Sequence, residues 1–412
     1  MLDVETYDAA ERAAAGKFAN RILQAFYPEM FATLGYPVRV DRVSQLWRYI
    51  DVMQETRTHY NVEVLLQGFT TEEFELFKRV TRIVDDHAGK HFGMRAHATA
   101  ALTRAIHVLR LIKIATGSDR PTVLEVGPGC GYLAMLLVME GYPYIGTDVV
   151  QAFYLYQSHM LSYVAENVRE LAAEDGDVLT VAQPQPGTAI HIPWWKWITL
   201  EPQEVKLSAG IMTSNHVLCE MHPSSLAYLA VLGHRVLSNH PGGGQFIFEN
   251  WGYDLLHSRA MVARKFQEHG WRVCHDETAM SAMVLAENVD QWLGKPAIKA
   301  AVPTKSTPQA VLWPSIRQFL VTLLGRVPPL KRLAVWAVLR IRKAFEPWPI
   351  AVVRGPAAPY PLSAKLTTGR KAVLARTVVH EDQLEAFLIS HFGGTVPRPP
   401  DEVLFDLIGT RQ

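Results

Sequence analysis

Between residues 121 and 290, short apolar runs alternate with longer segments in which apolar residues recur every three or four positions. The short runs are typical of buried strands and the longer segments of helices. The strands that we expect are residues 123–126, 145–147, 190–192, 209–214, 245–249, 272–275 and 282–286. Residues 178–182 are an alternative for the third strand. This alternation predicts a doubly wound, Rossmann-like α/β sheet with helices on both faces.

The helical segments extend beyond the sheet region. Within it we expect a helix beginning at Tyr132 and others at 151–173, 224–237 and 255–269. Residues 9–116 are predicted to be mostly helical, with clear periodicity at 71–84 and 95–116. We therefore interpret residues 1–118 as an N-terminal helical cap and residues 119–290 as the core domain.

Residues 291–412 are interpreted as an appended C-terminal region, because proline, alanine and basic residues become frequent there. Between positions 313 and 346 seven Lys or Arg residues stand against one acidic residue. Such a segment can lie on an anionic membrane or bind a phosphate-bearing substrate. The simpler interpretation, which we favour, is of partly helical structure docked on the core with a solvated basic face.

Composition and charge limit the classes of partner that we expect the protein to bind. The chain has 41 Lys and Arg against 40 Asp and Glu, so its net charge of +1 gives no reason to expect nucleic-acid binding. Its three cysteines are far apart and predict neither a disulfide framework nor a zinc site. The N-terminus does not resemble a signal peptide, and no stretch of 18 or more apolar, charge-free residues occurs. We expect a cytoplasmic protein that acts on a small molecule without a catalytic metal; a homodimer is left open.

The segment 121–149 is the most informative part of the chain. An apolar strand leads into Gly127, Gly129 and Gly131, and a second apolar strand ends at Asp148. Glycines permit a tight turn and close approach of a ligand, and an acid at that strand end can accept hydrogen bonds from ribose hydroxyls. The pattern therefore predicts an adenosine-type ligand.

The spacing distinguishes between nucleotide ligands. Tyr132 occupies the position where a dinucleotide-binding loop needs its third glycine, and no lysine follows Gly131 as a P-loop requires. The pattern E-x-G-x-G-x-G, which begins at Glu125, resembles motif I of the class I S-adenosylmethionine-dependent methyltransferases. An NAD-type or other nucleotide is the alternative.

The resemblance implies S-adenosylmethionine as cofactor and assigns roles in holding it. The glycine loop would lie along the methionine and ribose portions, Glu125 would orient the loop or the cofactor's amino group, and Asp148 would bind the ribose. The residues expected around the cofactor are Glu125, Gly127, Pro128, Gly129, Gly131, Asp148, Val149, Trp194 and Asn215. Trp194 is included because Trp194, Trp195 or Trp197 could stack on the adenine.

Candidate catalytic residues follow the fourth expected strand. Methyl transfer from a sulfonium needs an acceptor placed in line, and a base where that acceptor is a hydroxyl. His216 is the leading base, Glu220 its orienting group or substitute, and His222 a third candidate. The alternative for each histidine is a hydrogen-bonded structural role.

A second resemblance covers about residues 121–251. Asn215, the pair Glu220-Met221 and the run 191–195 are similar to a bacterial family described as sugar O-methyltransferases. It implies transfer of a methyl group to a hydroxyl of a sugar or specialised metabolite. The alternatives are N- or carboxyl-methylation in a natural-product pathway, and a cofactor-binding but inert protein or membrane-surface scaffold.

Overall fold

The computed structural model describes residues 1–26, 38–50, 62–175, 183–252, 257–277, 279–285 and 361–397. In this part of the chain, eight strands form one sheet in the order β3-β4-β2-β1-β5-β6-β8-β7. The strands are β1 (Val123–Val126), β2 (Tyr144–Asp148), β3 (Asn167–Glu170), β4 (Thr188–Pro193), β5 (Ile211–Thr213), β6 (Gln245–Phe248), β7 (Trp271–Glu277) and β8 (Met280–Leu285).

The sheet is parallel except at β8, which runs antiparallel to β6 and to β7. β1 pairs in parallel with β2 on one side and with β5 on the other, so the strand order reverses at β1. Ligands bind at such a reversal, outside the carboxyl ends of the strands. The predicted doubly wound α/β fold is confirmed.

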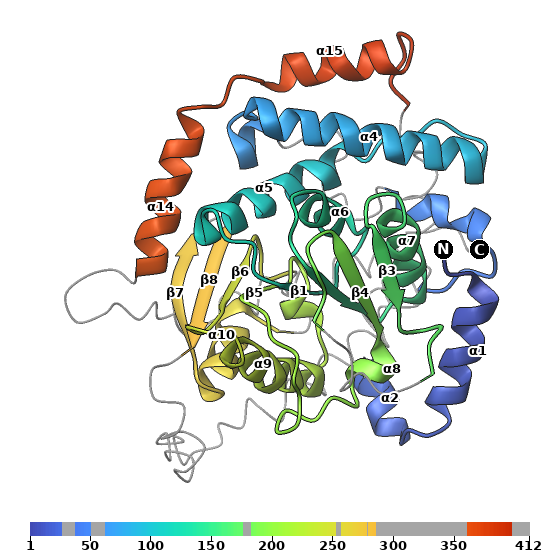
Figure 1. Ribbon diagram of the computed structural model, residues 1–412, viewed down its shortest axis with the longest axis vertical. Helices are drawn as coiled ribbons and strands as arrows, with labels where there is room; N and C mark the ends of the chain where they lie inside the picture. The colour runs from blue at the N-terminus through green and yellow to red at the C-terminus, as the bar shows by residue number, and fades with distance from the viewer. Residues whose placement is uncertain are drawn as a thin grey trace, which may run out of the picture.

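Helices cover both faces of the sheet (Figure 1). On one face of the sheet, buried apolar side chains of the strands form a cluster with those of four helices. These helices are α4 (Thr71–Phe92), α5 (Thr99–Thr116), α6 (Tyr132–Met139) and α7 (Gln151–Leu161). A second cluster joins the other face to α9 (Pro223–Ser238) and α10 (Arg259–Glu268). The apolar strands are therefore buried from both sides, as expected of a parallel sheet.

The N-terminal residues are mostly helical, as predicted. Besides α4 and α5 they form α1 (Val4–Ala15), α2 (Asn20–Phe26), η1 (Val43–Tyr49) and η2 (Val62–Leu66). The N-cap of α4 is Thr70, whose hydroxyl accepts from the amide of Glu73 at 3.3 Å. The Glu73 carboxylate accepts in return from the amide of Thr70 at 2.9 Å, which completes a capping box.

One helix was predicted too long. The helix expected over residues 151–173 ends at Leu161, and Asn167–Glu170 forms the edge strand β3, which pairs in parallel with β4. Three of the four side chains of β3 are polar and all four are incompletely buried, so the strand lacks the apolar run on which the prediction depended. Pairing with β4 determines its conformation. Residues 178–182, the alternative third strand, lie outside the described residues.

The described C-terminal segment forms α14 (Pro361–Leu374) and α15 (Glu381–His391). α14 packs on α5, where the amine of Lys365 donates to the carbonyl of Ala115 at 2.7 Å. α15 lies along α4, and the ring of Phe387 contacts those of Phe74 and Phe77 (Figure 1). The basic segment 313–346 and the proposed boundary at 290 lie outside the described residues. No described helix combines the length and apolar character needed to cross a bilayer.

Candidate functional site

The glycine loop between β1 and α6 follows a left-handed path. Gly127, Gly129 and Gly131 have φ angles of 71°, 58° and 77°. A Cβ on Gly127 would lie 2.7 Å from a methyl carbon of Val217, so a side chain there would clash. A Cβ on Gly129 would meet no atom within 4 Å, so the loop leaves open space beside this residue.

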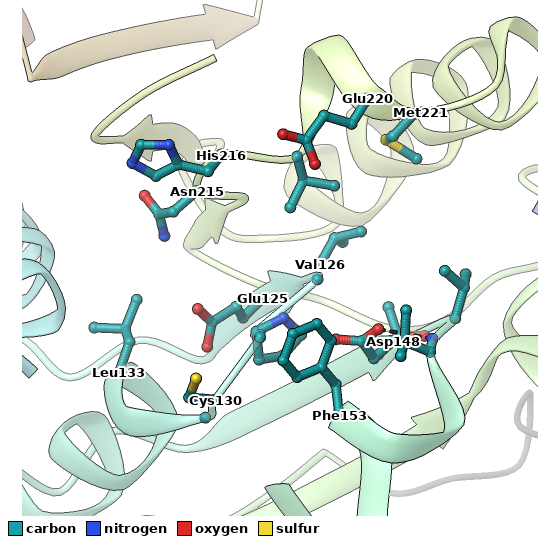
Figure 2. A pocket seen from close by; sticks show the side chains of 18 of the residues that line it. Glu125, Val126, Cys130, Leu133, Asp148, Phe153, Asn215, His216, Glu220 and Met221 are labelled. Carbon is teal, nitrogen blue, oxygen red and sulfur yellow. Dashed lines mark hydrogen bonds between the residues drawn. The ribbon is translucent and has the colours of Figure 1, made fainter. Parts of the chain in front are cut away.

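This open space belongs to a cavity of about 200 Å³ at the carboxyl ends of the central strands (Figure 2). Its wall includes eleven of the twelve residues predicted for the site: Glu125, Gly127, Pro128, Gly129, Gly131, Asp148, Val149, Asn215, His216, Glu220 and His222. The structure also places Arg104, Trp197 and Glu249 on the wall. Segments separated by more than 100 residues thus meet at one cavity.

Asp148 lies at the end of β2 and is 5% exposed. Its Oδ1 accepts from the amide of Val150 at 2.9 Å, and its Oδ2 accepts from the side-chain amide of Gln157 at 2.8 Å. Burial raises the pKa of Asp148, although these hydrogen bonds oppose the shift. Each carboxylate oxygen has a second lone pair that a ligand hydroxyl can use.

Glu125, on β1, points into the cavity (Figure 2). It is 2% exposed and accepts from the hydroxyl of Tyr144 at 2.9 Å. Burial raises the pKa of Glu125 to about 8, opposed by the Tyr144 hydrogen bond and reinforced by the charge of Asp148. Near neutral pH the side chain is therefore mainly protonated, so a cation placed beside it would favour release of that proton.

On the opposite side of the cavity, three polar side chains meet: Arg104 from α5, His216 after β5 and Glu249 after β6. Nε2 of His216 lies 3.1 Å from Oε2 of Glu249 and also contacts Nη1 of Arg104. Nη1 of Arg104 lies 3.5 Å from the other oxygen of Glu249. The side chains are 20%, 15% and 4% exposed respectively, so their charges interact in partial isolation from water.

Glu249 remains ionised in this cluster. Burial alone would raise its pKa, but the hydrogen bond from His216 and the charges of His216 and Arg104 outweigh it and hold the pKa below its ordinary value. The amide of Glu249 donates to Oδ1 of Asn215 at 2.9 Å, and Nδ2 of Asn215 donates to Thr213 at 3.0 Å. Asn215 thus links the ends of β5 and β6 and positions Glu249.

His216 has a φ of 60°, in the left-handed region. Its amide donates to the carbonyl of Asn250 at 3.0 Å, and the backbone of Gly252 packs closely against it. Histidine is among the few residues other than glycine that adopt this conformation with any frequency. The conformation is therefore held by contacts with the chain after β6.

The other two candidate catalytic residues, Glu220 and His222, are placed differently from His216. Glu220 lies in the short turn η4 (Leu218–Glu220), and the carboxylate that contacts His216 is that of Glu249 rather than Glu220. His222 is the N-cap of α9, where its Nδ1 accepts from the amide of Ser224 at 3.2 Å. Both side chains still line the cavity, but Figure 2 shows Glu220 apart from His216.

Trp194, expected to stack on a base, is not among the residues on the cavity wall. Its indole N–H donates to Glu11 of α1 at 2.6 Å, and its ring lies beside Phe18. These contacts turn it toward the N-terminal helices. Trp197, in the same short helix α8 (Trp194–Trp197), is the tryptophan that lines the cavity.

Sequence reasoning missed Arg104. A charged residue in the largely apolar helix α5 was the available signal, but Arg110 of the same helix gives the same signal. Arg110 forms a buried ion pair with Glu73 at 2.7 Å, away from the cavity. The described residues contain no group of three or more His, Cys, Asp or Glu side chains that could hold a metal ion.

No protein-family profile and no curated protein matches the chain. Among solved structures, magnesium protoporphyrin IX methyltransferase from Synechocystis PCC 6803, with bound SAM, is 13% identical and has a TM-score of 0.28 over 50% of this chain and 97% of that one. The glycopeptide N-methyltransferase MtfA is 11% identical, with a TM-score of 0.29 over 44% of this chain and 88% of that one.

A third similar structure is the N-methyltransferase NodS from Bradyrhizobium japonicum WM9 in complex with S-adenosyl-L-homocysteine. It is 11% identical, with a TM-score of 0.28 over 45% of this chain and 88% of that one. Similarities this weak carry no argument about activity. The fold of this chain is defined by its own strand order, and its chemistry has to be inferred from the cavity.

Proposed function

We propose that the protein is an S-adenosylmethionine-dependent methyltransferase whose acceptor is a hydroxyl of a sugar or another small metabolite. The observation that supports this most directly is the arrangement of one cavity. The glycine loop and Asp148 form one side of it, and a histidine with a carboxylate partner forms the other. Such a cavity can hold a nucleoside-bearing methyl donor against an acceptor whose proton must be removed.

The residues of the glycine-loop side, Glu125 to Gly131 and Asp148, fit this cofactor. The absence of a side chain at Gly129 leaves room for a ligand against the backbone of the loop. Asp148 would accept hydrogen bonds from the ribose hydroxyls, and Glu125 would face the cationic amino group. When bound, the cofactor supplies an electrophilic methyl group on a sulfonium.

The residues of the strand-exit side, Arg104, His216 and Glu249, would act on the acceptor. Nε2 of His216 lies between Arg104, which can only donate, and the carboxylate of Glu249, which accepts. For His216 to act as the base, its Nε2–H would donate to the ionised Glu249 and the N–H of Arg104 would turn to Glu249 as well. The lone pair of Nδ1 would then take the hydroxyl proton. The charge of Glu249 would stabilise the resulting imidazolium. Arg104 would pair with Glu249 and hold it beside the ring of His216.

The first test is binding. In calorimetry, S-adenosylmethionine and S-adenosylhomocysteine are expected to bind, and NADH is not. Failure of both sulfur compounds to bind, together with clean binding of NADH, would reject the proposal in favour of a dinucleotide enzyme.

The second test is turnover. Incubation with the methyl donor and a panel of sugars and metabolites should produce S-adenosylhomocysteine with at least one hydroxyl compound. Turnover confined to amines or carboxylates, and insensitive to replacement of His216, would favour the N- or carboxyl-methylation alternative. Tight cofactor binding without turnover on a broad panel would favour an inert cofactor-binding protein.

A further inference from the structure

A line of polar side chains, all buried except the partly exposed Glu170, leads from the edge of the sheet to the cavity. Oε1 of Glu170, on β3, lies 3.3 Å from Nδ1 of His191 on β4. Nε2 of His191 lies 2.9 Å from Oε1 of Gln157 on α7. Nε2 of Gln157 donates to Oδ2 of Asp148 and to the carbonyl of Gly129, each at 2.8 Å.

Gln157 is the member of this line that touches both ligand-facing elements of the glycine-loop side. Its side-chain amide donates hydrogen bonds to Asp148 at the end of β2 and to the loop carbonyl of Gly129. Its aliphatic part packs against Gly131, where an added Cβ would lie 3.0 Å from Cγ of Gln157. Gln157 itself is 1% exposed and is not part of the cavity wall, so it would act through the residues that it holds.

The hydrogen-bonding directions determine the role of His191. Both bonds made by Nε2 of Gln157 go to acceptors, so its oxygen faces His191 and needs a donor there. Nε2 of His191 therefore carries a proton and donates to it. His191 is 1% exposed, and its ring stacks on Tyr154 with centroids 3.5 Å apart and planes at 5°.

We propose that Gln157, oriented by His191, is a positioning residue that holds Asp148 and the glycine loop in the arrangement that binds the cofactor's ribose. This inference rests on the proposed function. Without Gln157, one oxygen of Asp148 would lose its donor and the loop carbonyl its tie to α7. Both changes would lower cofactor affinity while leaving the strand-exit side intact.

The test compares two glutamines of the same helix. Gln157→Met removes the amide but keeps the length of the side chain. Gln151→Met is the matched control, because Gln151 is also buried on α7. Its side-chain amide forms hydrogen bonds with Asp8 and with the backbone of Val40, and none with the cavity wall is among them. Calorimetry with S-adenosylhomocysteine should give a Kd increased about 10- to 30-fold for Gln157→Met, as expected for two lost hydrogen bonds, and an unchanged Kd for Gln151→Met.

A ligand variant separates positioning from general damage. The same titration with the 2′,3′-dideoxy form of S-adenosylhomocysteine should be much less affected by Gln157→Met, because the ribose hydroxyls that Asp148 would bind are already missing. Equal losses for both ligands would overturn the positioning role. His191→Phe, which can keep the stack on Tyr154, should raise the Kd about 3- to 10-fold because Gln157 loses its donor, and it replaces Gln157→Met if that variant does not fold.

The outcomes distinguish the two proposals. If the unaltered protein does not bind S-adenosylhomocysteine, the proposed function fails and this inference with it. If the unaltered protein binds and both the Gln157 and His191 variants bind as tightly, the positioning role alone is wrong.

Discussion

The two sides of the cavity are built in different ways. The glycine-loop side comes from one continuous stretch of chain, Glu125 to Asp148, and depends largely on backbone conformation. The strand-exit side comes from three segments, and each contributes one side chain to a shared cluster: Arg104, His216 and Glu249. A substitution on the first side should alter binding of the donor, and one on the second should alter the reaction of the acceptor.

The largest expected effect is on the strand-exit side. His216→Asn keeps a residue type that tolerates the left-handed backbone but removes the base. We expect kcat to fall by about 100- to 1000-fold, because proton removal from the acceptor loses its catalyst. The Kd for S-adenosylhomocysteine should be unchanged, because the glycine-loop side is intact. Steady-state kinetics and calorimetry on the same preparation measure both quantities.

His222→Asn is the control for that experiment. His222 also lines the cavity, but its ring caps α9, and asparagine is a good capping residue. If His222→Asn lost as much kcat as His216→Asn, the role of the base would be assigned to His222 instead. A near-normal rate in His216→Asn would reject a histidine base on this side altogether.

The next effect is at Asp148. Asp148→Asn should raise the Kd of S-adenosylhomocysteine about 30-fold or more, because charge-assisted hydrogen bonds to the ribose are lost. In addition, the NH₂ group of the asparagine can lie against the NH₂ group of Gln157, which places two donors together. Saturating cofactor should restore most of kcat. A fall in kcat that persists at saturation would show that the two sides do not act separately.

Asp276→Asn provides a matched control. Asp276 is also a well-bonded aspartate, accepting from Trp251 at 3.0 Å and Ser281 at 2.8 Å, but it is not part of the cavity wall. Its replacement should lower stability and leave the Kd unchanged.

A smaller effect is expected from methyl groups added to two glycines. Gly129 and Gly141 both have positive φ, 58° and 80°, and an added Cβ meets no atom within 4 Å at either position. Alanine should therefore cost about 1–2 kcal/mol of stability at each site through backbone strain. Only Gly129→Ala should weaken cofactor binding, by about tenfold, because Gly129 alone of the pair lines the cavity.

Thermal unfolding and calorimetry together test this pair. Equal loss of stability with unequal loss of affinity is the expected result. Unchanged affinity in Gly129→Ala would show that the ligand does not approach the loop backbone at this point.

The smallest expected change in cofactor affinity is a pH dependence that arises from Glu125. Its folded-state pKa, about 8, lies above its ordinary value of 4.5, so its contribution to stability is complete below pH 4.5 and is lost as the pH rises through 8. Cofactor affinity should move the other way and improve severalfold between pH 6 and 8.5, because the ionised carboxylate attracts a cation.

Glu125→Gln should flatten both profiles, measured by chemical unfolding and by calorimetry at each pH. A profile that stays unchanged in this variant would assign the titration to another group.

The residues of the glycine-loop side could be grouped from the sequence because its signals are local, and the structure places them on one cavity wall. A strand, three glycines and an acid at a fixed distance form a pattern that neighbouring residues complete. β3 was missed because three of its four side chains are polar, and pairing with β4, which no local pattern shows, gives it its extended conformation. Periodicity alone extended the preceding helix through it.

The strand-exit side was predicted only in part. His216 was recognised by its place after a buried strand, but its partner was expected at Glu220, four residues away, rather than at Glu249. No local pattern states that the ends of β5 and β6 are tied together by Asn215. Nor could sequence distinguish Arg104 from Arg110, since only the packing of α5 decides which arginine meets the cavity.

The left-handed backbone at His216 restricts how this protein can change over time. A β-branched residue at that position would have to reshape the connection out of β5 or unfold it, so few single substitutions are accessible there. Related chains could be sorted by this one position: those with histidine would retain the same acceptor chemistry, and those with asparagine or glycine would retain the shape without the base.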